Sequence, residues 1–132
     1  MKLIEFSFAE TPMSLQSRNK RRKRSYMNRI GALASSVAAV GFPNSTDDFY
    51  AKITYFHQGN TDLDVDNIIK PILDSLNGIL YADDKQVGEV NCKRIDLTDN
   101  YTITNSTPLL NTQLTQDNEF VYVELFQYDS IF

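Results

Sequence analysis

The chain has 132 residues, of which 42% are hydrophobic and 23% charged, and its net charge is −4. This length and composition predict one globular domain over residues 1–132, and they argue against a second core, a bilayer-spanning segment of roughly 20 apolar residues and a signal peptide. The single cysteine, Cys92, excludes an internal disulfide and a cysteine-rich zinc site. We therefore expect a cytoplasmic protein that does not bind membranes.

The first half of the chain shows the spacing of a strand, a helix and a second strand. Residues 2–8 alternate between apolar and polar side chains, which predicts a strand. The polar, basic segment 11–24 is typical of a loop. Ser25 can cap a helix whose apolar residues recur at helical spacing up to a stop at Gly41. Residues 49–57 alternate again and predict the second strand.

The second helix begins within an acidic motif. Asp64 or Asp66 is well placed as its N-terminal cap, and apolar residues at helical spacing continue to a stop at Gly78. Residues 86–97 then predict a third strand.

The C-terminal part contains the clearest strand of the chain, over residues 119–127. The preceding segment 98–117 is rich in Thr, Asn and Gln and has no clear periodicity. The expected element order is β-α-β-α-β-β. This order predicts a fold of the α/β (α+β) class, a mixed β-sheet with helices packed on it.

The basic residues are concentrated in one short segment. Seven of the 13 basic residues fall there, and the six others with 17 acidic residues give the rest of the chain a charge of −11. Such a segment is either a solvated surface or a contact for nucleic-acid phosphates. Beside an acidic metal-type motif we favour a DNA contact, made by Arg18, Lys20, Arg21, Arg22, Lys23 and Arg24, with Arg29 close by.

The acidic motif itself is the strongest functional signal. Three aspartates precede or open the second helix, one lies within it and two follow it, namely Asp62, Asp64, Asp66, Asp74, Asp83 and Asp84. Carboxylates this dense repel one another unless a cation lies among them. Mg²⁺ suits such a set, because it takes one or two carboxylates, several waters and phosphate oxygens. The motif therefore predicts a metal-dependent site acting on phosphate esters.

A calcium-binding EF-hand is the competing interpretation of the same aspartates. An EF-hand loop requires glycine at its sixth position and a bidentate glutamate at its twelfth. Those positions hold Asn67 and Leu73, and a strand is predicted where the EF-hand would need its incoming helix. The EF-hand interpretation fails.

The run Asp64-Val65-Asp66-Asn67-Ile68-Ile69-Lys70, followed by Asp74 and Asp83-Asp84-Lys85-Gln86-Val87, resembles the signature of the RusA-like Holliday junction resolvases. The resemblance implies a homodimeric, Mg²⁺-dependent endonuclease, with Mn²⁺ as a substitute, that cuts branched four-way DNA junctions by paired symmetric nicks. It implies that Asp64, Asp66 and Asp84 bind the metal and, together with Lys70, form the catalytic set. Asn67, Asp74 and Asp83 are then supporting residues.

Several nearby residues have simpler interpretations. We expect Asp62 to be a loop or helix-start charge, and Asp74 to pair with Lys70 rather than bind metal. His57 and Tyr81 are expected to be structural, and Cys92 to belong to the core.

Two features depart from the resemblance. The family commonly has basic residues just before the Asp-x-Asp motif, where this chain has residues 57–61, His-Gln-Gly-Asn-Thr. The 98–117 segment is also longer than the usual turn, and a loop of that length is often functional. A non-catalytic DNA- or protein-binding module of the same fold, and a nuclease for other branched DNA, stay open as alternatives.

Overall fold

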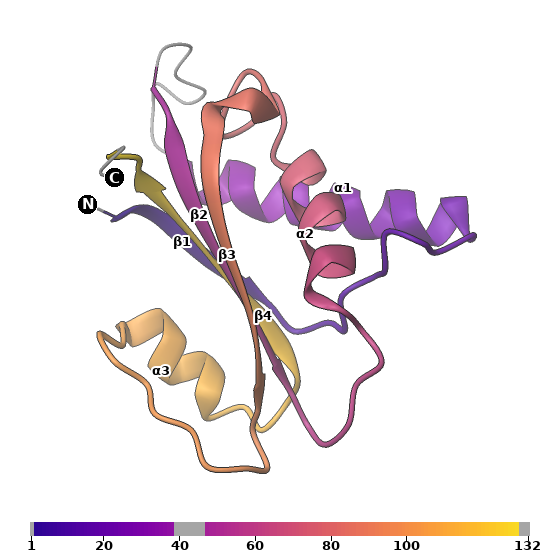
Figure 1. Cartoon of the computed structure of the whole chain (residues 1–132), viewed down its shortest axis with the longest axis vertical. Coiled ribbons are helices and arrows are strands. Elements are labelled where there is room, and N and C mark those ends of the chain that lie inside the picture. The colour runs from indigo at the N-terminus through magenta and orange to yellow at the C-terminus, as the bar shows by residue number, and fades with distance from the viewer. Residues whose placement is uncertain (1, 39–46, 130–132) are drawn as a thin grey trace.

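A computed structural model describes residues 2–38 and 47–129 and arranges its helices around one mixed sheet (Figure 1). The elements in chain order are β1 (Lys2–Phe8), α1 (Lys20–Val37), β2 (Phe49–His57), α2 (Val65–Ser75), the 3-10 helix η1 (Asp84–Gln86), β3 (Val87–Asp96), α3 (Pro108–Leu114) and β4 (Phe120–Gln127). The strand order is β1-β4-β2-β3, with β4 antiparallel to both neighbours and β3 parallel to β2. The predicted mixed sheet with packed helices is confirmed. No helix in the described ranges is long and apolar enough to cross a membrane.

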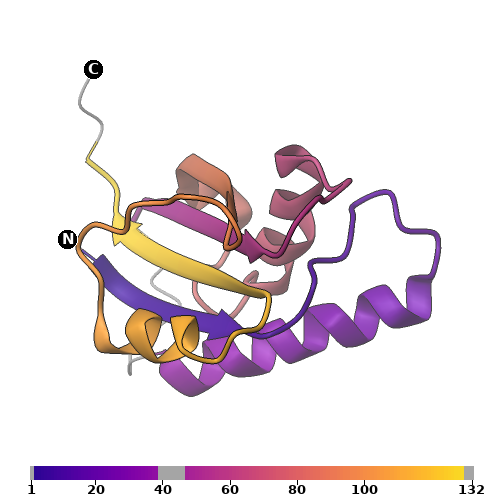
Figure 2. The same cartoon turned by 90° about the horizontal axis from the view of Figure 1, so that it is seen from below.

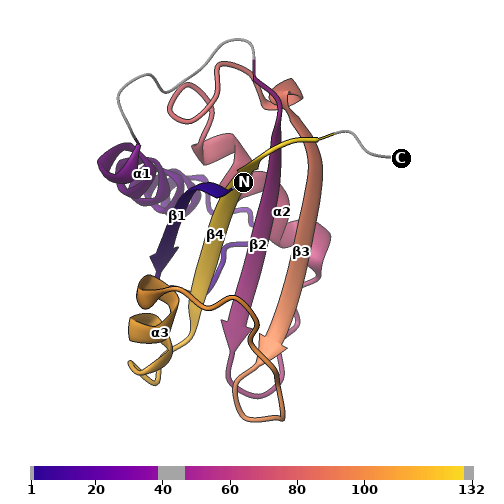
Figure 3. The ribbon, with the colours of Figure 1, turned by 90° about the vertical axis from the view of Figure 1, so that its left-hand side faces the viewer.

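The two faces of the sheet are covered by different helices (Figure 3). Helices α1 and α2 pack on one face, where Ile30 and Ile72 meet alternate residues of β2 in the main core. Helix α3 packs on the other face, where Leu110 joins Phe56 and Phe120 in a smaller cluster. The alternation of β2 therefore marks one face that is buried beneath α1 and α2 and a second face that is half-buried at the start of the strand and buried towards its end, near α3.

Helix α1 begins earlier than the sequence predicts. It starts at Lys20, capped by Asn19, whose Oδ1 accepts a hydrogen bond from the Arg22 N–H at 3.0 Å. The expected loop over residues 11–24 is therefore wrong in its last five positions, and Ser25 lies inside the helix. Asparagine is a strong N-terminal cap, and lysine and arginine are good helix formers, so the basic run extends the helix. The predicted stop at Gly41 lies outside the described residues.

Helix α3 is absent from the predicted element order. Thr107 caps it by accepting a hydrogen bond from the Leu110 N–H at 3.2 Å, and Pro108 occupies its first turn. The helix has seven residues and only Leu110 is buried, so no apolar period marks it in the sequence. The 98–117 segment is thus a loop followed by a short helix that covers part of the sheet.

Candidate active site and nucleic-acid interface

The acidic motif forms the entry to α2. Asp64 is the N-terminal cap residue in an extended conformation, and Asp66 lies in the first helical turn. The side chains of Asp62, Asp64 and Asp66 are exposed, and none forms a hydrogen bond or ion pair with another described residue. The positive end of the helix dipole favours such anions. These carboxylates are therefore available to an external cation.

A proline inside α2 links the acidic motif to the loop before α1. Pro71 has no N–H, so the carbonyl of Asn67 loses its intrahelical donor. The backbone N–H of Leu15 takes that place, 3.0 Å from the Asn67 oxygen. Lys23 Nζ, on α1, donates to the Leu15 carbonyl at 2.9 Å. The basic start of α1 is thereby held beside the acidic start of α2.

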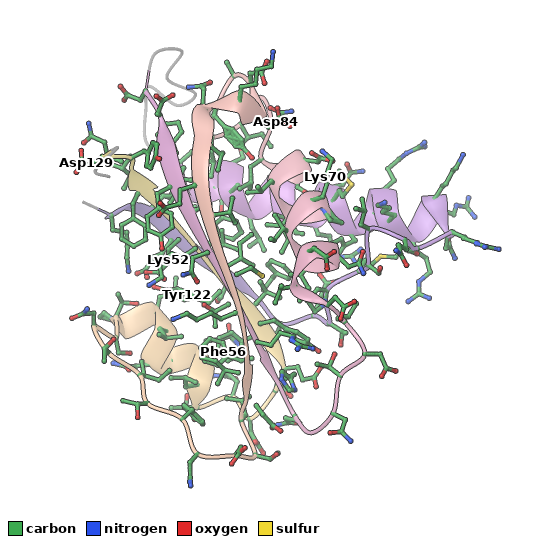
Figure 4. All side chains as sticks on the ribbon, viewed as in Figure 1. Lys52, Phe56, Lys70, Asp84, Tyr122 and Asp129 are labelled. Atoms are coloured by element: carbon green, nitrogen blue, oxygen red, sulfur yellow. The ribbon has the colours of Figure 1, made fainter. Side chains whose placement is uncertain are left out.

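Lys70 lies on the exposed side of α2, one turn before Asp74. Its Nζ donates to Asp74 Oδ1 at 2.9 Å. This hydrogen bond and the charge of Asp74 raise the pKa of Lys70, and the charge of Asp84 adds to the effect. Figure 4 shows Lys70 on α2 and Asp84 on η1 on the same side of the molecule. The Lys70 side chain is 56% exposed, so its ammonium can contact a bound anion.

The turn that carries Asp84 is fixed by a capping box. Asp83 Oδ1 accepts a hydrogen bond from the Lys85 N–H at 3.0 Å, and this backbone bond, followed by a hydrogen bond with Asp84, lowers the pKa of Asp83. Gln86 Oε1 in return accepts from the N–H groups of Ala82 at 2.8 Å and Asp83 at 3.2 Å. Asp83 therefore stabilises the turn from which Asp84 projects.

A buried tyrosine joins this turn to α2. Tyr81 has no exposed surface, and its hydroxyl donates to the Leu73 carbonyl near the end of the helix. Burial raises the pKa of this hydroxyl. Gly78, at φ +78°, donates its N–H to the Tyr81 carbonyl at 2.7 Å, in a conformation that suits glycine. Tyr81 is a packing residue, as expected.

Arg94 is a further candidate residue of this site, and the sequence alone did not indicate it. Arg94 lies on β3, and its Nη1 donates to the carbonyl of Leu63, the residue before Asp64, at 2.9 Å. It is exposed and forms no ion pair with any residue of the described ranges. The two residues are 31 positions apart in the sequence. The available signal was the parallel pairing of β2 and β3, which brings the loop after β2 close to the end of β3.

The predicted DNA-binding residues lie at one end of the molecule. Arg18 precedes α1 and the other five open it, and all except Lys23 are exposed. Figure 2 shows this end of α1 reaching beyond the sheet. Arg29 differs, because two of its nitrogens contact the Glu10 carboxylate at 2.6 and 2.9 Å. Cations at a helix N-terminus oppose the helix dipole, so helix stability does not explain the basic run.

His57 and Cys92 occupy structural positions. His57 is 8% exposed, and its Nδ1 lies 2.7 Å from the carbonyl of Gly59. Cys92 is half-buried against the main core, and burial raises its pKa to about 11. Both placements agree with the structural roles expected for them.

The donor set suits a hard cation but is not gathered into a cage. In the described ranges, no three His, Cys, Asp or Glu side chains are arranged to hold one metal ion. Asp64 and Asp66, which are exposed, and the half-buried Asp84 nevertheless offer carboxylate oxygens, the ligand type that Mg²⁺ prefers. Because Mg²⁺ completes its shell with water and phosphate oxygens, one or two of these carboxylates meet its needs.

The comparison with protein families identifies the family of the chain. A family model for endodeoxyribonuclease RusA matches residues 11–104, well over half of the chain. The matched region contains all the predicted catalytic residues and the basic start of α1, and it ends before α3 and β4. A search of curated proteins found no match. The chain belongs to the RusA endodeoxyribonuclease family.

Proposed function

We propose that this protein, as a single RusA-like domain over residues 1–132, is a Mg²⁺-dependent homodimeric endonuclease that resolves Holliday junctions by paired symmetric nicks. Membership of the family supports an endonuclease acting on DNA. The observation that carries the proposal is the link from the Leu15 N–H to the Asn67 carbonyl, 3.0 Å apart. This hydrogen bond holds the basic start of α1 beside the acidic start of α2.

Asp64, Asp66 and Asp84 would hold the metal ion, with Mn²⁺ as a substitute for Mg²⁺. When bound, Mg²⁺ supplies Lewis-acid polarisation of a phosphate and lowers the pKa of a coordinated water. The absence of hydrogen-bond or ion-pair partners for Asp64 and Asp66 in the described ranges supports this role. Without a cation, these charges repel the DNA backbone.

Lys70 would face the scissile phosphate and offset negative charge that develops on its oxygens. Asp74 supports this role by holding the Lys70 ammonium at 2.9 Å. Asp83 supports Asp84 by capping the turn of η1. Asn67 contributes through its carbonyl, which anchors the loop before α1.

The DNA backbone would lie across the start of α1. The exposed cations there can contact phosphates without first breaking an ion pair among the described residues. Arg94 would extend this surface to the other side of the acidic motif, since one nitrogen binds the Leu63 carbonyl and the guanidinium has further donors. The cation that is missing just before Asp64 in the sequence is thus available from β3.

Two copies of the chain would act on each junction. A four-way junction presents two equivalent strands, and a two-fold dimer with one site in each subunit matches that symmetry. The nicks would then fall at symmetric positions in recombination and repair intermediates.

The test is cleavage of a labelled four-way junction, a flap and a linear duplex, each with Mg²⁺, with Mn²⁺ and with EDTA. We expect symmetric nicks in the junction with either metal, and none with EDTA. Cleavage of the flap in preference to the junction would identify a nuclease for other branched DNA. Binding without any cleavage would identify a DNA-binding module that has lost turnover.

A further inference from the structure

Strand β3 forms one edge of the sheet, and the side chain of Tyr128, just after β4, lies against Gly88 at its beginning (Figure 3). It runs for ten residues, Val87–Asp96, and pairs with β2 on one side only. No other strand in the described ranges pairs with its outer edge. A long free edge offers backbone N–H and C=O groups to another strand, and proteins usually shorten or cover such edges.

The register with β2 assigns the side chains of β3 to the two faces. Glu89, Asn91 and Lys93 stand opposite β2 residues on the face of α3, whereas Val90 and Cys92 join the core beneath α1 and α2. Figure 4 shows Lys52, the β2 partner of Asn91, on the side of the sheet away from Lys70 and Asp84. The polar face of β3 thus carries an acid, an amide and a base in sequence.

This pattern is self-complementary about Asn91. In an antiparallel pair of two β3 strands with a two-fold axis at Asn91, Glu89 of each copy stands opposite Lys93 of the other. Neither side chain forms an ion pair with another residue of the described ranges. Moving the axis to Val90 would place Lys93 opposite Val87, and moving it to Cys92 would place Glu89 opposite Ile95. The charges therefore favour the register centred on Asn91.

We propose that β3 is the homodimer interface, and that a second copy of this chain adds its own β3 antiparallel to form one continuous sheet. The two-fold axis would stand perpendicular to the sheet, so that α1 and α2 of both copies lie on the same face. Both acidic motifs and both basic helix starts would then face one DNA molecule. This inference rests on the proposed function for its two-site requirement, but it can be tested without cleavage.

The test measures the dimer dissociation constant of the whole chain by analytical ultracentrifugation, without DNA or metal. The variants are Glu89→Lys, Lys93→Glu and the double variant carrying both changes. Each single change sets like charges opposite one another twice, and we expect dissociation constants at least about tenfold higher. The double variant restores opposite charges, and its dissociation constant should return to within about threefold of the wild-type value.

Two further variants complete the design. Lys52→Glu changes a lysine of the same face on the interior strand β2 and should leave the dissociation constant unchanged. Asn91→Asp places two carboxylates at the axis and should weaken the dimer even if a charge-reversal variant fails to fold.

Three results would overturn the interface: a wild-type protein that stays monomeric, single variants that dimerise as tightly as wild type, or a double variant as weak as the singles. If the wild-type dimer cleaves junctions but the variants have the same dimer dissociation constant, the interface is rejected and the proposed function stands. A wild-type protein that does not cleave junctions, but whose variants show the expected dissociation constants, would reject the proposed function and leave the interface standing.

Discussion

Removing positive charge from the first turn of α1 should strengthen the fold and weaken DNA binding. Lys20, Arg21 and Arg22 are exposed where the helix dipole is unfavourable to cations. Replacing all three by glutamine keeps helix propensity and removes repulsion worth a few tenths of a kcal/mol per charge. We expect the melting temperature to rise by about 2–5 °C at low salt, since about 1 kcal/mol corresponds to a shift of that size in a domain of this length.

The same substitution should change the salt dependence of DNA binding. Five cations of the basic run are exposed, which gives a slope of log K against log salt near −4.5 at about −0.9 per phosphate contact. The triple variant retains two of them, so its slope should be near −1.8. Fluorescence anisotropy on a four-way junction at several salt concentrations measures both slopes.

Arg29→Gln is the matched control, because Arg29 lies on the same helix but its guanidinium already binds Glu10. It should leave the slope unchanged and should not raise the melting temperature. An unchanged slope in the triple variant, or an equal change in the Arg29 variant, would refute the placement of DNA on the start of α1.

Three other predictions concern stability. Tyr81→Phe removes the hydrogen bond from the buried Tyr81 side chain to the Leu73 carbonyl and should cost about 1–2 kcal/mol in urea unfolding, whereas Tyr101→Phe, at an exposed position, should cost less than about 0.5 kcal/mol. Burial opposes ionisation of Glu119, but hydrogen bonds from Gln58, Tyr55 and Thr11 lower its pKa below the usual 4.5. Its contribution to stability is therefore complete above that value and lost as pH falls through the lower folded-state pKa, so the advantage of wild type over Glu119→Gln should shrink between about pH 6 and pH 3. Mg²⁺ at about 100 times its dissociation constant should stabilise the free protein by about 2.7 kcal/mol relative to EDTA at matched ionic strength, and the absence of a thermal shift would contradict a metal site formed without DNA.

The strands and α2 could be predicted because burial marks them in the sequence. The β2 strand alternates because one face is buried in the main core and the other is only half-buried over its first residues, and α2 carries buried residues at helical spacing. The start of α1 could not be placed in this way, since Asn19 and all but one of the cations after it are exposed and leave no apolar period. Helix α3 was not predicted for the same reason, because Leu110 is its single buried residue.

The candidate site could likewise be predicted only in part. The motif from Asp64 to Lys70 is contiguous, so its chemistry is visible in the sequence. The contacts that surround it join distant segments, as Leu15 joins Asn67 and Arg94 joins Leu63. Such contacts depend on strand order and on the carbonyl that Pro71 leaves without a donor, and sequence spacing does not encode either directly.

The most direct measurement of the central claim is single-turnover cleavage of a four-way junction by Asp66→Asn and Asp84→Asn, with junction affinity measured by gel shift on the same DNA. Each change keeps side-chain size and removes a negative ligand. We expect cleavage to fall at least about 100-fold, equivalent to about 2.7 kcal/mol in the barrier, while affinity stays within a few-fold of wild type. Asp62→Asn and Asp74→Asn are the matched controls and should be milder, since neither residue is assigned to the metal. Full cleavage by a folded Asp66→Asn or Asp84→Asn protein, with folding checked by circular dichroism, would contradict the assignment of these carboxylates to the active site.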